Sequence, residues 1–324
     1  MPKVSIVIPT YKVEKYIERC ARSLFGQTLD SIEYIFVDDC SPDNSIAVMQ
    51  KVLEEYPQRK EQVKVIRHEI NQGVGAARNH GVEACTGDYI IHCDPDDWVD
   101  LNMYEAMYNK AIENNADMVC CDIVRENTNT NSAKFIIHKK FSDIDTYIIR
   151  NIGVIHNSLC EKMYKREVAL DKSLYIPDHI CMGEDLLRNI QMLLKCKRAT
   201  YIPVAYYHYM VNNTSLTRCV KSDVIENLYE IICFLGKNLP QKYHSVEHRV
   251  RRNILLMSII WKNPSLNDLI QYIWNTTPLS VKFGIIIDKN FSWKSKLLVL
   301  TACINRELTT QILTYLRNKN YIKL

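Results

Sequence analysis

The first 124 residues alternate between short apolar runs and segments in which apolar residues recur at helical spacing. Because buried strands need helices to cover them, this alternation predicts an α/β fold with a parallel sheet and helices on both of its faces. The predicted strands span 4–9, 32–39, 63–68, 88–94 and 118–124, and the predicted helices span 14–26, 44–56, 71–85 and 100–114.

Polar side chains follow three of these predicted strands at the point where each one ends. Such sheets bind ligands at the carboxyl ends of their strands, so we expect these side chains to line a ligand site. They are Thr10 and Tyr11, Asp38 and Asp39, and Asp94, Asp96 and Asp97.

The pattern changes near residue 219, beyond which strand signals nearly vanish. We therefore predict a nucleotide-sugar-binding domain over 1–218, as argued below, and a helical C-terminal region over 219–324. The predicted helices of this second region span 222–237, 244–262, 264–275, 293–304 and 305–318.

The segment 293–318 interleaves leucines and isoleucines with Lys and Arg. A basic amphipathic helix of this kind can lie on an anionic membrane surface. The structural alternative is that its apolar face packs on the rest of the helical region. Both readings stay open at this point.

Composition narrows the class of protein. The net charge of +4, from 41 basic and 37 acidic residues, is too mild to indicate nucleic acid binding. The sequence shows no secretory signal and no apolar run of about 20 residues. The 12 cysteines form no CxxC pair, which is typical of reduced thiols. We expect a cytoplasmic protein, with peripheral attachment to the inner face of the cell membrane as an added alternative.

The carboxylates of Asp94, Asp96 and Asp97 are crowded behind a buried strand. Hard divalent cations such as Mg²⁺ and Mn²⁺ bind one or two carboxylates together with phosphate oxygens. The structural alternative is a plain Asp-Pro turn. The strand context favours the metal site, because a cation would offset the repulsion between the carboxylates.

Asp39 also ends a predicted strand, and its carboxylate could accept a hydrogen bond from N3–H of uracil or thymine. N1–H of guanine would also suit it, whereas N3 of cytosine is itself an acceptor. Tyr11 could stack on a base. The structural alternatives are that Asp39 caps the turn before Ser41 and that Tyr11 covers a sheet edge, and spacing alone favours these alternatives.

Gly73, Gly75 and Arg78 resemble part of a phosphate-binding loop, but the third glycine is missing and the loop follows the third predicted strand. A dinucleotide site is therefore not expected. Arg78 could contact a base or a phosphate, or it could be a surface arginine of a helix, and the sequence does not decide between them.

The segment 182–196 predicts an apolar helix face behind Glu184 and Asp185. Acidic residues suit a helix N-terminus in any case, although an ionised carboxylate there could also serve as a general base. His208 lies among tyrosines, where a structural histidine is the usual reading and a metal or pyrophosphate ligand is the functional one.

Taken together, these segments resemble the family 2 glycosyltransferases of the GT-A fold, of the type that builds bacterial surface polysaccharides. Four positions depart from the common pattern, namely Lys12, Cys40, Pro95 and Glu161. The matching motifs are VSIVIPTYKVEKYIERCARSLFGQT, IEYIFVDDCSPDNS, NQGVGAARNHGVEACTGDYIIHCDPDDWVD, SLCEKMYKRE, GED at 183–185 and YYHYMVNNTSLT.

The resemblance implies a Rossmann-like, mostly parallel sheet flanked by helices, and a role for each matching residue. The metal implied is Mn²⁺ or Mg²⁺. The residues implied to bind the nucleotide are Pro9, Tyr11, Asp39, Arg78, Asp94 and Asp96. Those implied to bind the metal are Asp96, Asp97 and His208. Glu184 is implied to bind the acceptor, and Asp185 is implied to be the catalytic general base.

The implied activity is metal-dependent, inverting transfer of a hexose or N-acetylhexosamine from a nucleotide-diphosphate sugar, UDP-linked in our expectation, to a hydroxyl of a glycan or lipid-linked glycan. One rival is a sugar nucleotidyltransferase, which would need a Gly-rich triphosphate loop where this chain has PTYK. The other is a non-catalytic sugar-nucleotide-binding relative, against which the intact Asp96 and Asp185 argue.

Overall fold

The structure, a computed structural model, describes residues 1–127, 130–153, 157–174, 176–211, 222–260 and 296. The chain divides into two compact units, Met1–Asn213 and Thr214–Leu324. The sequence placed this division between residues 218 and 219.

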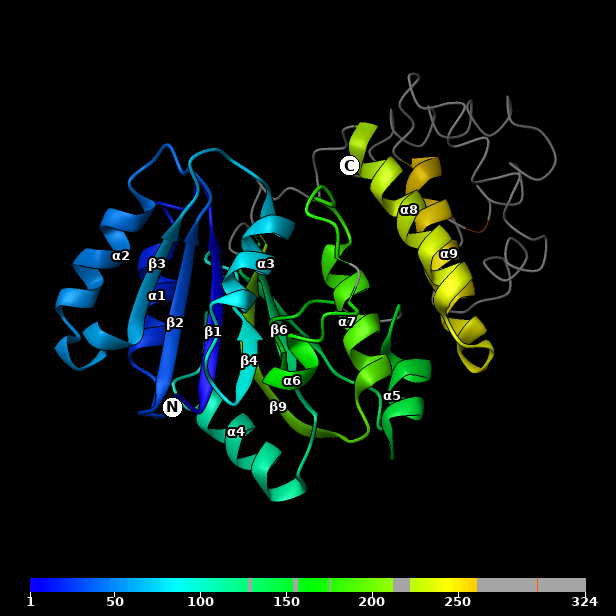
Figure 1. The fold of residues 1–324 in the computed structure, drawn as a ribbon, viewed down its shortest axis with the longest axis horizontal. Coiled ribbons are helices and arrows are strands. Elements are labelled where there is room, and N and C mark those ends of the chain that lie inside the picture. Colours follow the sequence, from blue (N-terminus) through cyan, green and yellow to red (C-terminus); the bar gives the residue numbers. More distant parts are fainter. Residues whose placement is uncertain (128–129, 154–156, 175, 212–221, 261–295, 297–324) are drawn as a thin grey trace. The chain divides into compact units, whose positions relative to one another are not determined.

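The first unit contains a nine-stranded sheet with the order β3-β2-β1-β4-β8-β6-β9-β5, in which β7 adds to β6 (Figure 1). The strands are β1 Val4–Thr10, β2 Ile32–Asp38, β3 Val63–Arg67, β4 Tyr89–His92, β5 Trp98–Val99, β6 Met118–Asn127, β7 Ser132–Ile136, β8 Lys162–Lys165 and β9 Ala199–Met210.

Strand direction differs between the two halves of the sheet. β3, β2, β1 and β4 are parallel neighbours, which places the ends of β1, β2 and β4 at one edge. β8 is antiparallel to both β4 and β6, and β6 is parallel to β9. The predicted α/β class and the helix-flanked GT-A arrangement are confirmed.

The sequence analysis missed the long strand β9. Its pairing with β6 shifts between Ile202 and Ala205, so Pro203 and Val204 lie at an irregularity in the ladder. Proline cannot donate to a ladder and is tolerated at such bulges. The bulge interrupts the two-residue alternation that would have indicated a strand.

Helices cover both faces of the parallel strands, as Figure 1 shows for α3 and α1. The helices of this unit are α1 Ile17–Phe25, α2 Ser45–Glu54, α3 Val74–Glu83, α4 Met103–Asn114, α5 Ile144–Asn151, α6 Arg166–Ala169 and α7 Glu184–Lys195, with a 3₁₀ helix at Pro57–Gln62.

The close approach of α3 to the sheet depends on Gly81. A side chain at this position would collide with Val7 of β1 and press on Val37 of β2. On the opposite face, Ile6 and Ile8 of β1 are fully buried in the core that contains α1. This packing fixes the N-terminus of α3 beside the carboxyl ends of β1 and β2.

The second unit contains α8 Ser222–Asn238 and α9 His244–Ile260, with a 3₁₀ helix at Gln241–Tyr243. The predicted helices 264–275 and 305–318 lie outside the described residues, as does all of 293–304 except Lys296. Within the parts of the chain that the structure describes, no helix combines the length and apolarity needed to cross a bilayer.

Candidate active site at the carboxyl ends of the strands

Asp39 is held in one orientation directly after β2. Its Oδ1 lies 2.7 Å from Nδ1 of His68 and accepts from the backbone N–H of Gln72 at 2.8 Å, while Oδ2 accepts from the N–H of Gly73 at 2.9 Å. The side chain is 3% exposed. Ser41 donates its backbone N–H to Asp38, at 2.9 Å, so the expectation that Asp39 caps this turn is wrong.

The two other residues expected near the nucleoside lie on the neighbouring strand. Pro9 is buried within β1, next to Val37 of β2 in the parallel register. Tyr11 follows β1 and is 40% exposed, and Nζ of Lys12 lies 5.1 Å from the centre of its ring.

Gly73 and Gly75 serve the placement of α3. Gly73 has a φ of 90°, a conformation that favours glycine, and its N–H is directed at Asp39. A Cβ on Gly75 would lie 2.8 Å from the carbonyl oxygen of Ile180. The glycines thus seat the helix between Asp39 and the loop that leads into α7.

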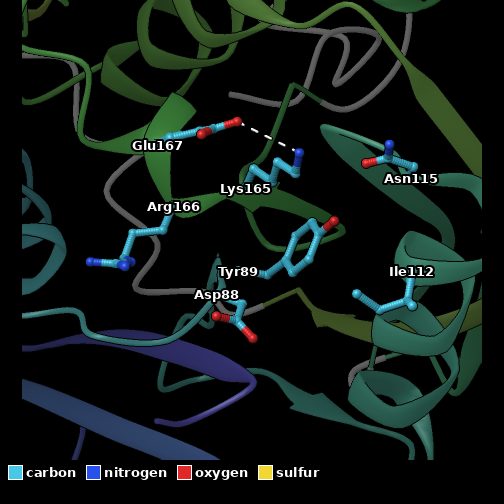
Figure 2. Close-up of a pocket in the computed structure, with 7 residues that line it drawn as sticks. All are labelled: Asp88, Tyr89, Ile112, Asn115, Lys165, Arg166 and Glu167. Carbon is cyan, nitrogen blue, oxygen red and sulfur yellow. Dashed lines mark ion pairs between the residues drawn. The ribbon is translucent and has the colours of Figure 1, made fainter.

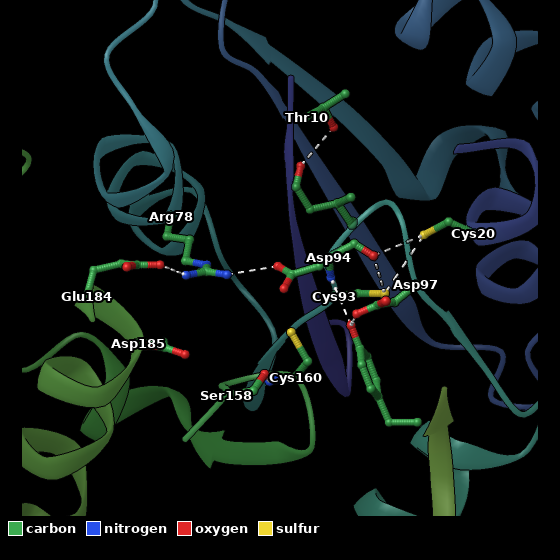
Figure 3. Close-up of polar contacts among 12 residues, drawn as sticks. Thr10, Cys20, Arg78, Cys93, Asp94, Asp97, Ser158, Cys160, Glu184 and Asp185 are labelled. Atoms are coloured by element: carbon green, nitrogen blue, oxygen red, sulfur yellow. Dashed lines mark hydrogen bonds and ion pairs between the residues drawn. The ribbon is translucent and has the colours of Figure 1, made fainter. Parts of the chain in front are cut away.

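Arg78 joins two carboxylates that come from different parts of the fold. Its guanidinium donates to Asp94 at 2.8 Å and forms a short hydrogen bond with Glu184, as Figure 3 shows. Arg78 is only 6% exposed, which excludes the reading of a surface arginine. Burial acts to lower the pKa of Arg78, but the charges of Asp94 and Glu184 raise it above its usual value.

Glu184 and Asp185 open α7 after Gly183, whose φ of 83° turns the chain into the helix. Glu184 is 9% exposed. Burial raises the pKa of Glu184 to about 7, against the effect of Arg78, and repulsion from Asp185 adds to the rise. Asp185 is half-buried, and its Oδ1 accepts from the N–H of Leu186 at 2.7 Å. Figure 3 shows Asp185 beside the Arg78–Glu184 pair.

The predicted metal ligands are not assembled around one point. Asp97 is 1% exposed, and its two oxygens accept from Tyr207 Oη at 2.6 Å and from the N–H of Met210 at 2.7 Å. Burial raises the pKa of Asp97 well above its usual range, and Asp96 and Asp94 add repulsion. Asp96 is half-buried. Among the described residues, no three His, Cys, Asp or Glu side chains are grouped so that they could hold a metal ion.

His208 is occupied by contacts of its own. Its ring stacks on Trp98 with 3.5 Å between centroids and an interplanar angle of 15°. Nδ1 lies 2.6 Å from Glu126 and Nε2 lies 3.2 Å from Asp100. The structure therefore brings Arg78, Asp94, Glu184 and Asp185 together, whereas His208 belongs to a neighbouring cluster.

Sequence reasoning missed His68, whose Nε2 lies 2.9 Å from Nδ1 of His80. His68 closes the predicted strand 63–68, so the rule that singled out Asp39 also applied to it. It also missed Tyr207, the hydroxyl partner of Asp97, because the strand that carries it was not recognised.

A pocket of about 430 Å³ lies away from this site and is lined by Asp88, Tyr89, Ile112, Asn115, Lys165, Arg166 and Glu167 (Figure 2). Asp88 precedes β4, whereas Asp94 follows it, so the pocket lies near the opposite edge of the sheet. Its Lys165 is paired with Glu167 at 3.6 Å and with Asp117 at 3.7 Å.

Known proteins resemble this chain both in sequence and in fold. EpsH of Bacillus subtilis is 30% identical over 73% of this chain and 70% of its own length. The poly(ribitol-phosphate) beta-glucosyltransferase of Bacillus spizizenii is 29% identical over 70% of this chain, and the match spans 35% of that enzyme.

The crystal structure of TarS residues 1–349 of Staphylococcus aureus with UDP-GlcNAc matches with a TM-score of 0.69 at 19% identity, covering 98% of this chain and 92% of that one. This likeness shows the fold. The family model for glycosyl transferase family 2 matches residues 5–171, which contain Asp39, Arg78 and the Asp94–Asp97 cluster. The chain therefore belongs to glycosyl transferase family 2.

Proposed function

We propose that this glycosyltransferase moves a hexose or N-acetylhexosamine, with inversion, from a UDP-linked donor to a hydroxyl of a glycan or lipid-linked glycan. The observation that carries the proposal is the Arg78 bridge. It connects the strand-end carboxylate of Asp94 to Glu184 at the start of α7, and Asp185 follows directly. Groups for a donor and for a base thus lie within one site.

The donor nucleoside lies, in this proposal, against Pro9 and Tyr11, with the base on Asp39. The buried carboxylate of Asp39 can accept from an imide N–H of uracil, whereas cytosine presents an acceptor there. Arg78 and Asp94 lie beside the base and the ribose. The UDP-GlcNAc complex of TarS supports a UDP-linked donor.

A divalent cation fits the chemistry of this edge, because the carboxylate oxygens behind β4 are the hard ligands that Mg²⁺ and Mn²⁺ prefer. We assign Asp96 as the residue that would hold it. Asp97 is held by a hydrogen bond from Tyr207, and His208 is held by its contact with Glu126. When bound, the cation supplies charge neutralisation at the leaving diphosphate. The Mn²⁺ and GDP-mannose complex of the Pyrobaculum calidifontis mannosyltransferase, with a TM-score of 0.54, has a similar fold.

Asp185 is the general base of the proposed reaction. It takes the proton of the acceptor hydroxyl as that oxygen attacks the anomeric carbon from the face opposite the leaving group. One displacement with one base inverts the configuration. Glu184 contacts the acceptor while paired with Arg78. Both side chains begin α7, whose N-terminus favours negative charge.

Two relatives, the Bacillus spizizenii enzyme and TarS of Staphylococcus aureus, are poly(ribitol-phosphate) glycosyltransferases, which supports a cell-surface polymer or its lipid-linked precursor as the acceptor. We propose peripheral attachment to the inner face of the membrane through 293–318. Co-sedimentation of the full chain with anionic vesicles, lost in high salt, is the expected result.

Asp185→Asn tests the mechanism. We expect transfer to fall by about 10²–10⁴-fold while UDP binding is kept, because asparagine keeps the shape but cannot take the proton. UDP release from a panel of UDP-sugars with Mn²⁺ measures turnover, and calorimetry measures binding. Turnover within a few-fold of wild type would show that Asp185 only begins a helix.

The same assays separate the rival functions. A nucleotidyltransferase would release pyrophosphate from UTP and a sugar 1-phosphate. A non-catalytic relative would bind UDP-sugar without releasing UDP, with or without an acceptor.

A further inference from the structure

Two histidines, His68 and His80, form a chain of contacts that begins at Asp39. His68 directly follows β3, and its Nδ1 lies 2.7 Å from Oδ1 of Asp39. His80 comes from α3 and places Nδ1 2.9 Å from Nε2 of His68. The two rings meet edge to face, with centroids 4.9 Å apart and an interplanar angle of 86°. His68 is 9% exposed.

The proton positions in this chain follow from its first member. An ionised carboxylate only accepts, so Nδ1 of His68 must carry a proton and donate it. In neutral His68, Nε2 then has a lone pair, and Nδ1–H of His80 is the donor that faces it. Asp39 thereby selects one tautomer of each ring.

The remaining capacity of Asp39 can be counted. Its two oxygens offer about four lone-pair sites. Oδ1 is used by His68 and by the N–H of Gln72, and Oδ2 is used by the N–H of Gly73. One site on Oδ2 is left for a single N–H donor.

We propose that His68 and His80 are positioning residues that set the base preference of the donor site. By donating to Oδ1, the relay of His80 and His68 fixes the orientation of the Asp39 carboxylate, so that Oδ2 presents an acceptor to the imide N–H of uracil. This inference rests on the proposed contact between Asp39 and the donor base.

Loss of the hydrogen bond from His68 to Asp39 predicts the direction in which base preference should change. Without the His68 donor, Asp39 loses the hydrogen bond that holds Oδ1, so Oδ2 is no longer fixed toward the imide N–H of uracil. Selection against cytidine nucleotides should therefore weaken.

Variants of the full chain separate positioning from simple packing. His68→Leu removes the donor. His68→Asn is the matched control, because its side-chain amide can donate from near the position of Nδ1. His80→Phe keeps a ring against His68 but cannot donate to it. Calorimetry with UDP and CDP gives the affinity ratio for each variant.

We expect the UDP-to-CDP affinity ratio to fall about tenfold in H68L, to fall less in H80F, and to stay near wild type in H68N, in line with the loss of one hydrogen bond to a charged group. Long-range ¹H–¹⁵N spectra of the wild type should show His68 protonated on Nδ1 and unprotonated on Nε2. In H80F this signature should weaken.

An unchanged ratio in folded H68L, or in H80F if H68L does not fold, would overturn the proposal. So would an Nε2–H tautomer of His68 in the wild type. If the wild type binds no UDP, the proposed function itself fails, and the base-selecting role fails with it. The tautomer spectra need no ligand and report on the relay alone, so the two failures can be told apart.

Discussion

Replacing Arg78 by methionine should destabilise the sheet unit severely. The guanidinium is the buried cation between Glu184 and Asp94, whose side chains are 11% and 29% exposed. Methionine is similar in length but leaves both carboxylates without this partner. Removing one member of a buried charged pair typically costs about 3–5 kcal/mol.

That loss converts into a measurable melting shift. In a unit of this size, each kcal/mol lowers the midpoint by about 2–4 °C, so R78M should melt about 6–20 °C below wild type. Differential scanning calorimetry measures the midpoint. The double variant R78M/E184Q should recover part of the loss, because a buried glutamine needs no cationic partner.

Arg22 offers the matched control. It also pairs with two carboxylates, those of Glu18 and Glu55, but the three side chains are 40%, 59% and 50% exposed. Solvent screens such pairs, so Arg22→Met should shift the midpoint far less. The reasoning from burial is refuted if R78M and R22M have the same melting midpoint. It is also refuted if adding E184Q to R78M does not raise the midpoint.

Three further predictions concern the same edge of the sheet. Asp96→Ala should weaken UDP binding in Mn²⁺ by about tenfold or more but change metal-free binding little, and calorimetry showing equal losses would place Asp96 at the nucleoside. Because burial raises the pKa of Glu184 to about 7 from an ordinary value near 4.5, its contribution to stability is lost as pH rises through this window. Wild type should therefore lose melting temperature relative to E184Q between about pH 5 and 8, and a constant difference would contradict the raised pKa. Gly75→Ala should destabilise by about 1–3 kcal/mol, since its Cβ meets a backbone oxygen, whereas Gly236→Ala should cost little in the same melts.

The parallel half of the sheet could be predicted because its signals are local. The run 4–9 is apolar except for Ser5, as expected of a strand covered on both faces, and the structure has β1 over Val4–Thr10. Asp39 was located by the same logic, since a polar residue directly after such a run lies at a ligand edge.

The mixed half could not be predicted in this way. β8 is four residues long and its neighbours come from distant parts of the chain, so no periodicity marks it. The strand pattern of β9 is interrupted at Pro203, where its pairing with β6 is irregular. The Arg78–Glu184 contact joins residues 106 positions apart, and nothing in either local sequence specifies the other.

The contacts of His208 could not be predicted from its local sequence. A histidine among aromatics suggested a metal ligand only through family resemblance. The contacts that decide its surroundings, with Trp98 and Glu126, depend on the pairing of β9 with β5 and β6.

The helix α3 has a consequence for engineering. Gly73 at its N-cap meets Asp39, Arg78 in its middle reaches Glu184, and Asn79 donates to the carbonyl of Ile176 in the loop before α7. One helix therefore sets the spacing between Asp39, the proposed base contact, and Glu184 beside the proposed general base. An engineered exchange of donor pockets between relatives should therefore transfer α3 and the loop before α7 together. Either segment alone would lose the contacts that hold it against the other.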